Sequence, residues 1–188
     1  METLNAQAIM ESQALTRLKH IQLELESNPM GRIEDLRRFA DTWYCYTHGF
    51  VTRSLKANWH KIDFNRELTE GIVELIEEHT ISGLKKMKSK LYVKKEHVIP
   101  IGVIEQKLLE LGNKASLEDI AKVLNENLIY ATISKAEDAM LRDKNTAGGN
   151  LSSKMPAEYY DKDHELYGDP FARYKIKGIK IVSPLNCS

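Results

Sequence analysis

Apolar residues in the first 90 positions recur at intervals of three and four, which is the spacing of amphipathic helices. Three helices are expected, over residues 3–26, from Asn28-Pro29 past Gly49 towards Trp59, and from about Asn65 to residue 90. Asn28 suits an N-cap, and Pro29 suits the first position of a helix. The pattern therefore predicts an antiparallel helical bundle over residues 1–90.

The pattern changes at Lys90, beyond which β-type runs and short helical segments alternate. Strands are expected around residues 91–99, over 128–133 and over 174–182, and helices over 101–111, 117–125 and 134–142. Ser116 with Asp119, and Ser134 with Glu137, are capping boxes that mark two helix starts. The predicted class is α+β, predominantly helical. In it, residues 91–188 form a ββα-like unit with a helical insertion and a C-terminal strand, and this part is expected to pack with the bundle as a single domain.

Composition and charge narrow the function classes. The chain has 27 Lys and Arg and 27 Asp and Glu, so its net charge is zero. Proteins that coat nucleic acid non-specifically usually carry a basic excess. Cys45 and Cys187 lie far apart, which excludes a zinc ribbon and a disulfide-rich scaffold. No apolar run has the length of a signal peptide or a membrane span. We therefore expect a cytoplasmic protein that does not enter a membrane.

One segment carries candidate chemistry. Residues 96–100 read Glu-His-Val-Ile-Pro, an acid followed by His, two β-branched residues and Pro. Asn127 directly precedes the second predicted strand, and Glu137 and Asp138 lie on the helix after it. These candidate residues thus lie at the end of one predicted strand, directly before the next and on the helix after it.

This arrangement, over residues 91–142, resembles the core of the HNH, or His-Me finger, nucleases. There, an Asp-His-Ile-Ile-Pro run ends the first strand of a ββα unit. The chain departs from the family in having Glu96 for the usual Asp, about thirty residues between His97 and Asn127, and Glu137 where many relatives have His. The resemblance implies a divalent-metal-dependent endonuclease that acts on DNA rather than RNA.

The resemblance also implies a role for each residue. His97 would be the general base, because a neutral imidazole accepts a proton near neutral pH. Glu96 and the Asn127 side-chain oxygen would hold Mg²⁺ or Mn²⁺, with Glu137 or Asp138 completing the ligands. Arg142 would steady the scissile phosphate through two hydrogen bonds.

A lysine run leads into Glu96-His97. Its members are Lys85, Lys86, Lys88, Lys90, Lys94 and Lys95. In a nuclease this run would bind the nucleic-acid backbone. Alternatively, it is a solvated helix end, where lysines complement the C-terminal helix dipole.

Two other functions remain open. Arg53 and His60, seven residues apart on a predicted helix, loosely resemble the Arg-x6-His element of HEPN ribonucleases. The chain could instead be a non-catalytic interaction protein, a subunit of a larger complex or a toxin antidote, in which Glu96-His97 is structural. The N-terminal helices are expected to bind a second copy or another protein, because four of their apolar residues have no obvious neighbours within the domain that would bury them. These residues are Leu15, Leu18, Ile21 and Leu25.

Overall fold

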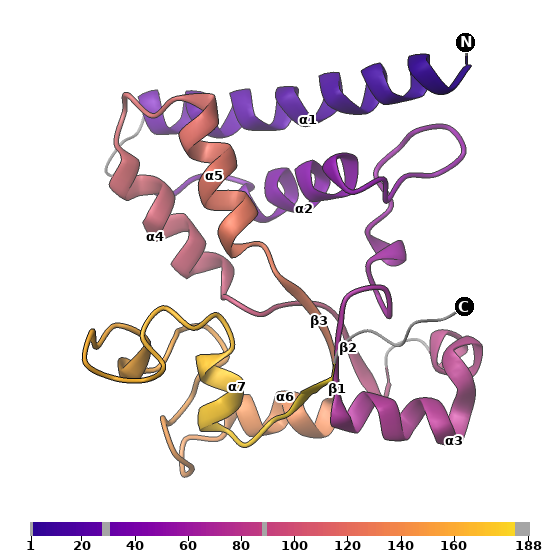
Figure 1. Cartoon of the computed structure of the whole chain (residues 1–188), viewed down its shortest axis with the longest axis vertical. Coiled ribbons are helices and arrows are strands. Elements are labelled where there is room, and N and C mark those ends of the chain that lie inside the picture. Colours follow the sequence, from indigo (N-terminus) through magenta and orange to yellow (C-terminus); the bar gives the residue numbers. More distant parts are fainter. Residues whose placement is uncertain (1, 28–30, 88–89, 183–188) are drawn as a thin grey trace. The chain divides into compact units, whose positions relative to one another are not determined.

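The computed structural model describes residues 2–27, 31–87 and 90–182, and the chain divides into two compact units (Figure 1). Unit 1 combines Met1–Ile62 with Ile101–Leu128, and unit 2 combines Asp63–Pro100 with Ile129–Ser188. Helices accompanied by a small mixed sheet confirm the predicted α+β, predominantly helical class. The expected single domain, with a change of character at residue 90, differs from this division, because the two-helix insertion belongs with the N-terminal helices. None of the described helices is both long enough and apolar enough to span a bilayer.

Unit 1 consists of the N-terminal helices and the two-helix insertion. Its elements are α1 (Glu2–Ser27), α2 (Leu36–Thr47), the 3₁₀ helix η1 (Trp59–Lys61), α4 (Ile101–Leu111) and α5 (Leu117–Asn127). Helix α1 packs against α2 and α5 (Figure 1), and α2 also contacts α4. At the start of α5, the Ser116 hydroxyl accepts a hydrogen bond from Asp119 N, and the Asp119 carboxylate accepts one from Ser116 N. The predicted capping box is confirmed.

The apolar stripe of α1 is mostly covered within unit 1. Leu18, Ile21 and Leu25 are 8%, 0% and 1% exposed, whereas Leu15 is 42% exposed. The expectation of a partner on the N-terminal helices rested on this stripe being uncovered. That premise is wrong for three of the four residues, because α2 and α5 supply the cover.

Helix α2 is shorter than the pattern predicts. It ends at Thr47, and Gly49 then adopts a φ of 71°. This left-handed conformation cannot continue a helix, so Val51 and Ala57 form a β-bridge instead, and Trp59 begins η1. The predicted helix start at Asn28 and Pro29 lies outside the described residues.

Unit 2 is built on a sheet whose strand order is β2-β3-β1-β4. Its elements are β1 (Glu67–Thr69), α3 (Glu70–Lys86), β2 (Tyr92–His97), β3 (Tyr130–Ser134), α6 (Lys135–Arg142), the 3₁₀ helix η2 (Ala157–Tyr159), α7 (Ala172–Ile176) and β4 (Ile181–Val182). Strands β1 and β3 are parallel, and the other two pairs are antiparallel. The helix predicted from Asn65 begins only at Glu70, because the residues before it pair with β3 and β4.

The predicted ββα order is present in unit 2. Strand β2 pairs antiparallel with β3, and α6 follows β3 directly and contacts both strands. The capping box of Ser134 and Glu137 at the start of α6 is confirmed. The order of these elements is the one that the resemblance implies, but it does not by itself fix where their side chains point.

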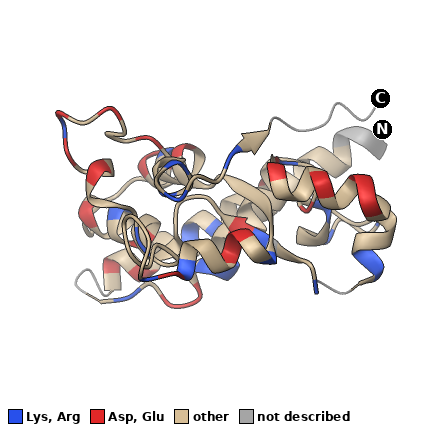
Figure 2. Ribbon diagram, turned by 90° about the horizontal axis from the view of Figure 1, so that it is seen from below, with Lys and Arg blue, Asp and Glu red and all other residues tan. Residues whose placement is uncertain are grey.

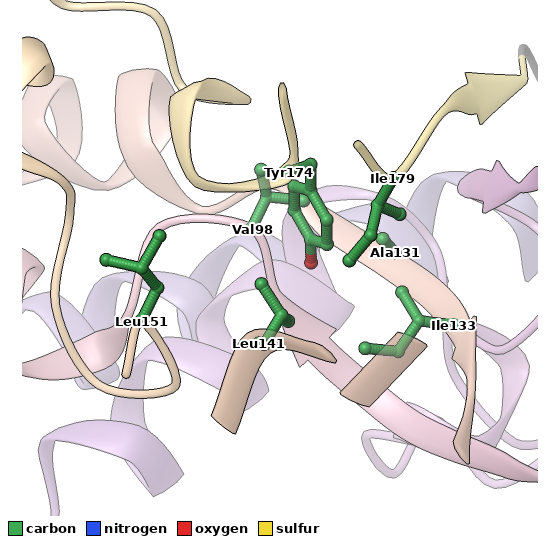
Figure 3. Packing of buried hydrophobic residues seen from close by; sticks show 7 residues of the cluster. All are labelled: Val98, Ala131, Ile133, Leu141, Leu151, Tyr174 and Ile179. Carbon is green, nitrogen blue, oxygen red and sulfur yellow. The ribbon is translucent and has the colours of Figure 1, made fainter. Parts of the chain in front are cut away.

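The strand predicted over residues 174–182 is wrong over most of its length. The segment begins as the helical turn α7, and only Ile181 and Val182 pair in the sheet. The turn carries Tyr174 into the core of unit 2, where its ring is 0% exposed and lies between Val98 and Ile179, with Leu141 nearby (Figure 3).

Candidate functional site

Glu96 and His97 end β2 and lie on opposite faces of the sheet. In the pairing with β3, Glu96 is opposite Ala131, and His97 is opposite Tyr130. Successive strand residues project to alternate faces, and Ala131 belongs to the core cluster shared with α6 and α7. Glu96 therefore faces α6 and α7, and His97 faces the other side of the sheet.

The carboxylate of Glu96 pairs with a buried guanidinium. Arg173 of α7 is 0% exposed, and its Nη2 lies 2.5 Å from Glu96 Oε1. The same side chain donates from Nε to the Val98 carbonyl at 2.8 Å and from Nη1 to the Leu151 carbonyl at 3.1 Å. It also donates to the His97 carbonyl. Arg173 thus joins the end of β2 to α7 and to the loop after α6.

The side chain of His97 is buried beside that of Tyr130. The residue is only 5% exposed, and the centroid of its ring lies 4.9 Å from that of Tyr130, which is 1% exposed. A general base must reach the water that it deprotonates. A buried imidazole against a buried tyrosine is the geometry of a packed core histidine.

Glu137 caps two helices at once. Its Oε2 accepts hydrogen bonds from Ser134 N and Oγ, both at 2.8 Å, and from Thr69 Oγ1 at 2.5 Å. Its Oε1 accepts one from Gly71 N, in the first turn of α3, at 3.1 Å. Glu137 is 8% exposed. A carboxylate at a helix N-terminus satisfies unpaired N–H groups and complements the helix dipole, and Glu137 does so for both α6 and α3.

Asn127 belongs to unit 1, whereas Glu96, His97 and Glu137 belong to unit 2. Its side-chain oxygen accepts a hydrogen bond from Lys107 Nζ at 2.7 Å. Its amide nitrogen donates to the Val123 carbonyl at 2.7 Å. Both ends of the amide are therefore engaged inside unit 1.

Arg142, the predicted phosphate ligand, lies at the exposed end of α6. Its Nε donates to Asp138 Oδ2 at 3.1 Å, and its side chain is 64% exposed. The hydrogen bond to Asp138 and the charge of that carboxylate raise the pKa of Arg142, and the charge of Glu96 adds to this effect. Arg142 is thus near the carboxylates of both Asp138 and Glu96, and it is open to solvent.

The lysines between residues 85 and 95 differ in their exposure and in their backbone conformation. Lys88 lies outside the described residues, and the side chain of Lys94 is not described. Lys90 is exposed, whereas Lys95 is partly buried. The φ of Lys95 is 47°, at an irregularity in the pairing of β2, and its backbone N–H donates to Asp63 Oδ1 at 3.0 Å. These residues do not share one environment.

The side chains predicted to hold Mg²⁺ or Mn²⁺ are engaged by protein groups. Glu96 is paired with Arg173, Asn127 with Lys107, and both oxygens of Glu137 accept hydrogen bonds. Within residues 2–27, 31–87 and 90–182, no group of three or more His, Cys, Asp and Glu side chains could hold a metal ion. A hard divalent cation needs several oxygens directed at one point, so the residues as arranged do not fit it.

Arg53 and His60 do not share a helix. Arg53 lies in the turn closed by the bridge between Val51 and Ala57, and His60 lies in η1. The predicted helix through both is wrong because α2 ends at Thr47. Their spacing of seven residues therefore does not place the two side chains on one face of a helix.

Sequence reasoning missed Arg173 and the partners of Glu137. Thr69 and Gly71 are distant from Glu137 in sequence, and no local pattern connects them. An arginine flanked by Phe171, Ala172 and Tyr174 is the one available signal for Arg173, because a charge in an apolar segment needs partners when it is buried.

The ionisation of Tyr174 is disfavoured by its surroundings. Burial raises the pKa of its hydroxyl well above the ordinary 10.0, and Arg173 opposes part of this rise. The negative charge of Glu96 acts in the same direction as burial. The pKa of Tyr92 is also raised, by burial first and then by Asp63.

The free energy of unfolding is expected to decrease as the pH rises above 10. The unfolded state then loses the Tyr174 proton while the folded state keeps it, so the unfolded state binds fewer protons. One such group changes the stability by at most about 1.4 kcal/mol per pH unit. Tyr174→Phe should flatten the decrease measured by urea unfolding from about pH 8 to pH 11. Equal slopes for the wild type and Tyr174→Phe would contradict this.

Two structural centres hold unit 2 together. One is the buried Arg173–Glu96 pair, and the other is the Glu137 cap shared by α3 and α6.

The chain matches no protein-family model, no curated protein and no solved structure in the three comparisons made.

Proposed function

We propose that the chain is a non-catalytic interaction protein, a subunit of a larger complex or a toxin antidote. The observation that supports this proposal is that Glu96 and His97 face opposite sides of the sheet, each in structural contacts. A hydrolytic site would need the base, a metal-bound oxygen set and a water at one point. In the proposed protein, the Glu-His-Val-Ile-Pro run ends β2 and anchors Arg173.

A second candidate is a divalent-metal-dependent endonuclease acting on DNA. The observation that favours it is the antiparallel β2–β3 pair followed by α6, with Arg142 near enough to Glu96 for that charge to raise its pKa. DNA as a partner, and the lysines as backbone contacts, belong to this candidate.

One experiment separates the two candidates. Wild type and His97→Gln are incubated with supercoiled plasmid and Mg²⁺ or Mn²⁺, and circular dichroism verifies that both are folded. The interaction protein is expected to produce no metal-dependent nicking in either form. Nicking by the wild type that His97→Gln abolishes would overturn the first proposal and support the endonuclease.

Binding of a partner protein is the direct test of the first proposal. A partner that copurifies at fixed stoichiometry from the native source should bind the purified protein with a dissociation constant of about 1 μM or below. His97→Gln should leave this affinity unchanged, because His97 is buried. If no partner copurifies at fixed stoichiometry and purified candidates fail to bind, the proposal is wrong.

A further inference from the structure

An acidic hollow borders the first half of α3. It has a volume of about 460 Å³ and is lined on the α3 side by Glu70, Glu74 and Glu78. These residues are four apart, so they form one stripe about 12 Å long on the helix. Lys135 and Lys180 also line the hollow, and Lys180 pairs with Glu70 at 3.2 Å. Glu137 lines the hollow as well, but it is buried as the cap of α3 and α6, so Glu74 and Glu78 are the exposed carboxylates that are not paired with Lys180.

A basic hollow borders the end of α3, beyond a kink at Thr80, where the backbone leaves the helical conformation (φ 58°, ψ 158°). It has a volume of about 420 Å³ and is lined by Lys86, Met87, Lys90 and Leu91. Leu91 also lines the acidic hollow, so the two hollows adjoin at this residue. Figure 2 shows α3 with red acidic bands along its first turns and blue at its end.

Apolar side chains accompany both charged regions. Met140 is 41% exposed in the acidic hollow, and Leu91 is partly buried at the junction. Apolar area of this kind is covered when proteins associate, and flanking opposite charges set the orientation of the partners.

We propose that this surface binds a second copy of the chain, with a twofold axis near Leu91, where the two hollows adjoin. The acidic hollow of each copy then faces the basic hollow of the other. A surface that carries both signs side by side is self-complementary under twofold symmetry, which is the commonest symmetry of protein dimers. Nucleic acid would be repelled by Glu74 and Glu78, and a basic peptide would leave Lys86 and Lys90 facing like charge.

The inferred dimer goes beyond the proposed function and is compatible with either candidate. It also concerns a different surface from the N-terminal helices, since all the residues that it uses lie in unit 2. A failed dimerisation test would therefore leave both functional candidates standing, and metal-dependent nicking would leave the dimer standing.

Charge exchange tests the proposal on the full chain. Two double variants are made, one with Glu74→Lys and Glu78→Lys, and one with Lys86→Glu and Lys90→Glu. Sedimentation velocity should show the wild type as a dimer at micromolar concentrations. Each double variant alone should have a dimer dissociation constant at least about 100-fold higher, because like charges face each other across the axis. The four replaced residues are exposed, so folding should be retained.

Sedimentation of a mixture of the two double variants is the decisive measurement. An equimolar mixture of the two double variants should form a heterodimer, because one copy then presents only basic and the other only acidic residues. Glu77→Lys is the matched control: Glu77 is exposed on α3 but does not line the acidic hollow, and its dimerisation should equal that of the wild type. A monomeric wild type, dimers of unchanged affinity in both double variants, or a mixture that stays monomeric would each overturn the proposal.

Discussion

Arg173→Ala is expected to lower the free energy of unfolding by about 3–5 kcal/mol, the range for breaking a buried ion pair by removing one partner. The change leaves Glu96 without its guanidinium, and it removes the hydrogen bonds that Arg173 donates to three carbonyls, those of His97, Val98 and Leu151. It also opens a cavity beside Tyr174, which Arg173 contacts. Urea unfolding followed by circular dichroism measures the effect.

The control for Arg173 lies two residues further on. Lys175 also belongs to α7 and pairs with Asp169, but its side chain is 58% exposed. Lys175→Ala should therefore cost less than about 1 kcal/mol. If Arg173→Ala is too unstable to purify, Glu96→Gln provides a milder test, because it removes the charge and keeps an oxygen acceptor. An unchanged urea midpoint in both the Arg173 and the Glu96 variants would contradict a structural role for the pair.

Glu137→Ala is expected to cost about 2–4 kcal/mol, because one carboxylate serves as the cap of two helices. The change leaves the N–H groups of Ser134 and Gly71 and the hydroxyl of Thr69 without this acceptor. Helix α3 and helix α6 should therefore both lose protection against amide hydrogen exchange in their first turns. Loss of protection confined to α6 would show that the bond to Gly71 contributes nothing.

A double-mutant cycle with Gly71 sharpens this test. A Cβ on Gly71 would lie 2.9 Å from the Glu137 carboxyl carbon, closer than such contacts allow. Gly71→Ala should thus destabilise the wild type but be nearly neutral in the Glu137→Ala background, where the space is free. Gly102→Ala is the matched control, because a Cβ there meets nothing within 4 Å. Additive effects at Gly71 and Glu137 would argue against the close contact.

These experiments bear on function as well as stability. If Arg173 and Glu137 are structural to the expected degree, two of the predicted metal ligands, Glu96 and Glu137, are needed to hold unit 2 together. Substitutions at either residue would then abolish any activity by unfolding, so His97 is the informative position for testing catalysis. This is why the nicking experiment uses His97→Gln.

Local features of the fold were predictable from the sequence. The capping boxes at Ser116 and Ser134 join residues three apart, so their geometry depends only on the helical start itself. The α1 helix, the two helices of the insertion and strand β3 also follow from local spacing and β-branched residues. The mostly helical α+β class and the ββα order of unit 2 are therefore determined by local sequence patterns.

Contacts between distant residues decided the rest. Residues 67–69 became a strand through pairing with β3 and β4, and the segment after residue 171 became a helical turn around the buried Arg173. The run around Glu96 and His97 was recognisable as a pattern, but the register against Ala131 and Tyr130 assigned each side chain to its face. Sequence spacing describes neighbours within one element, whereas register, burial and shared caps depend on segments that only the folded chain brings together.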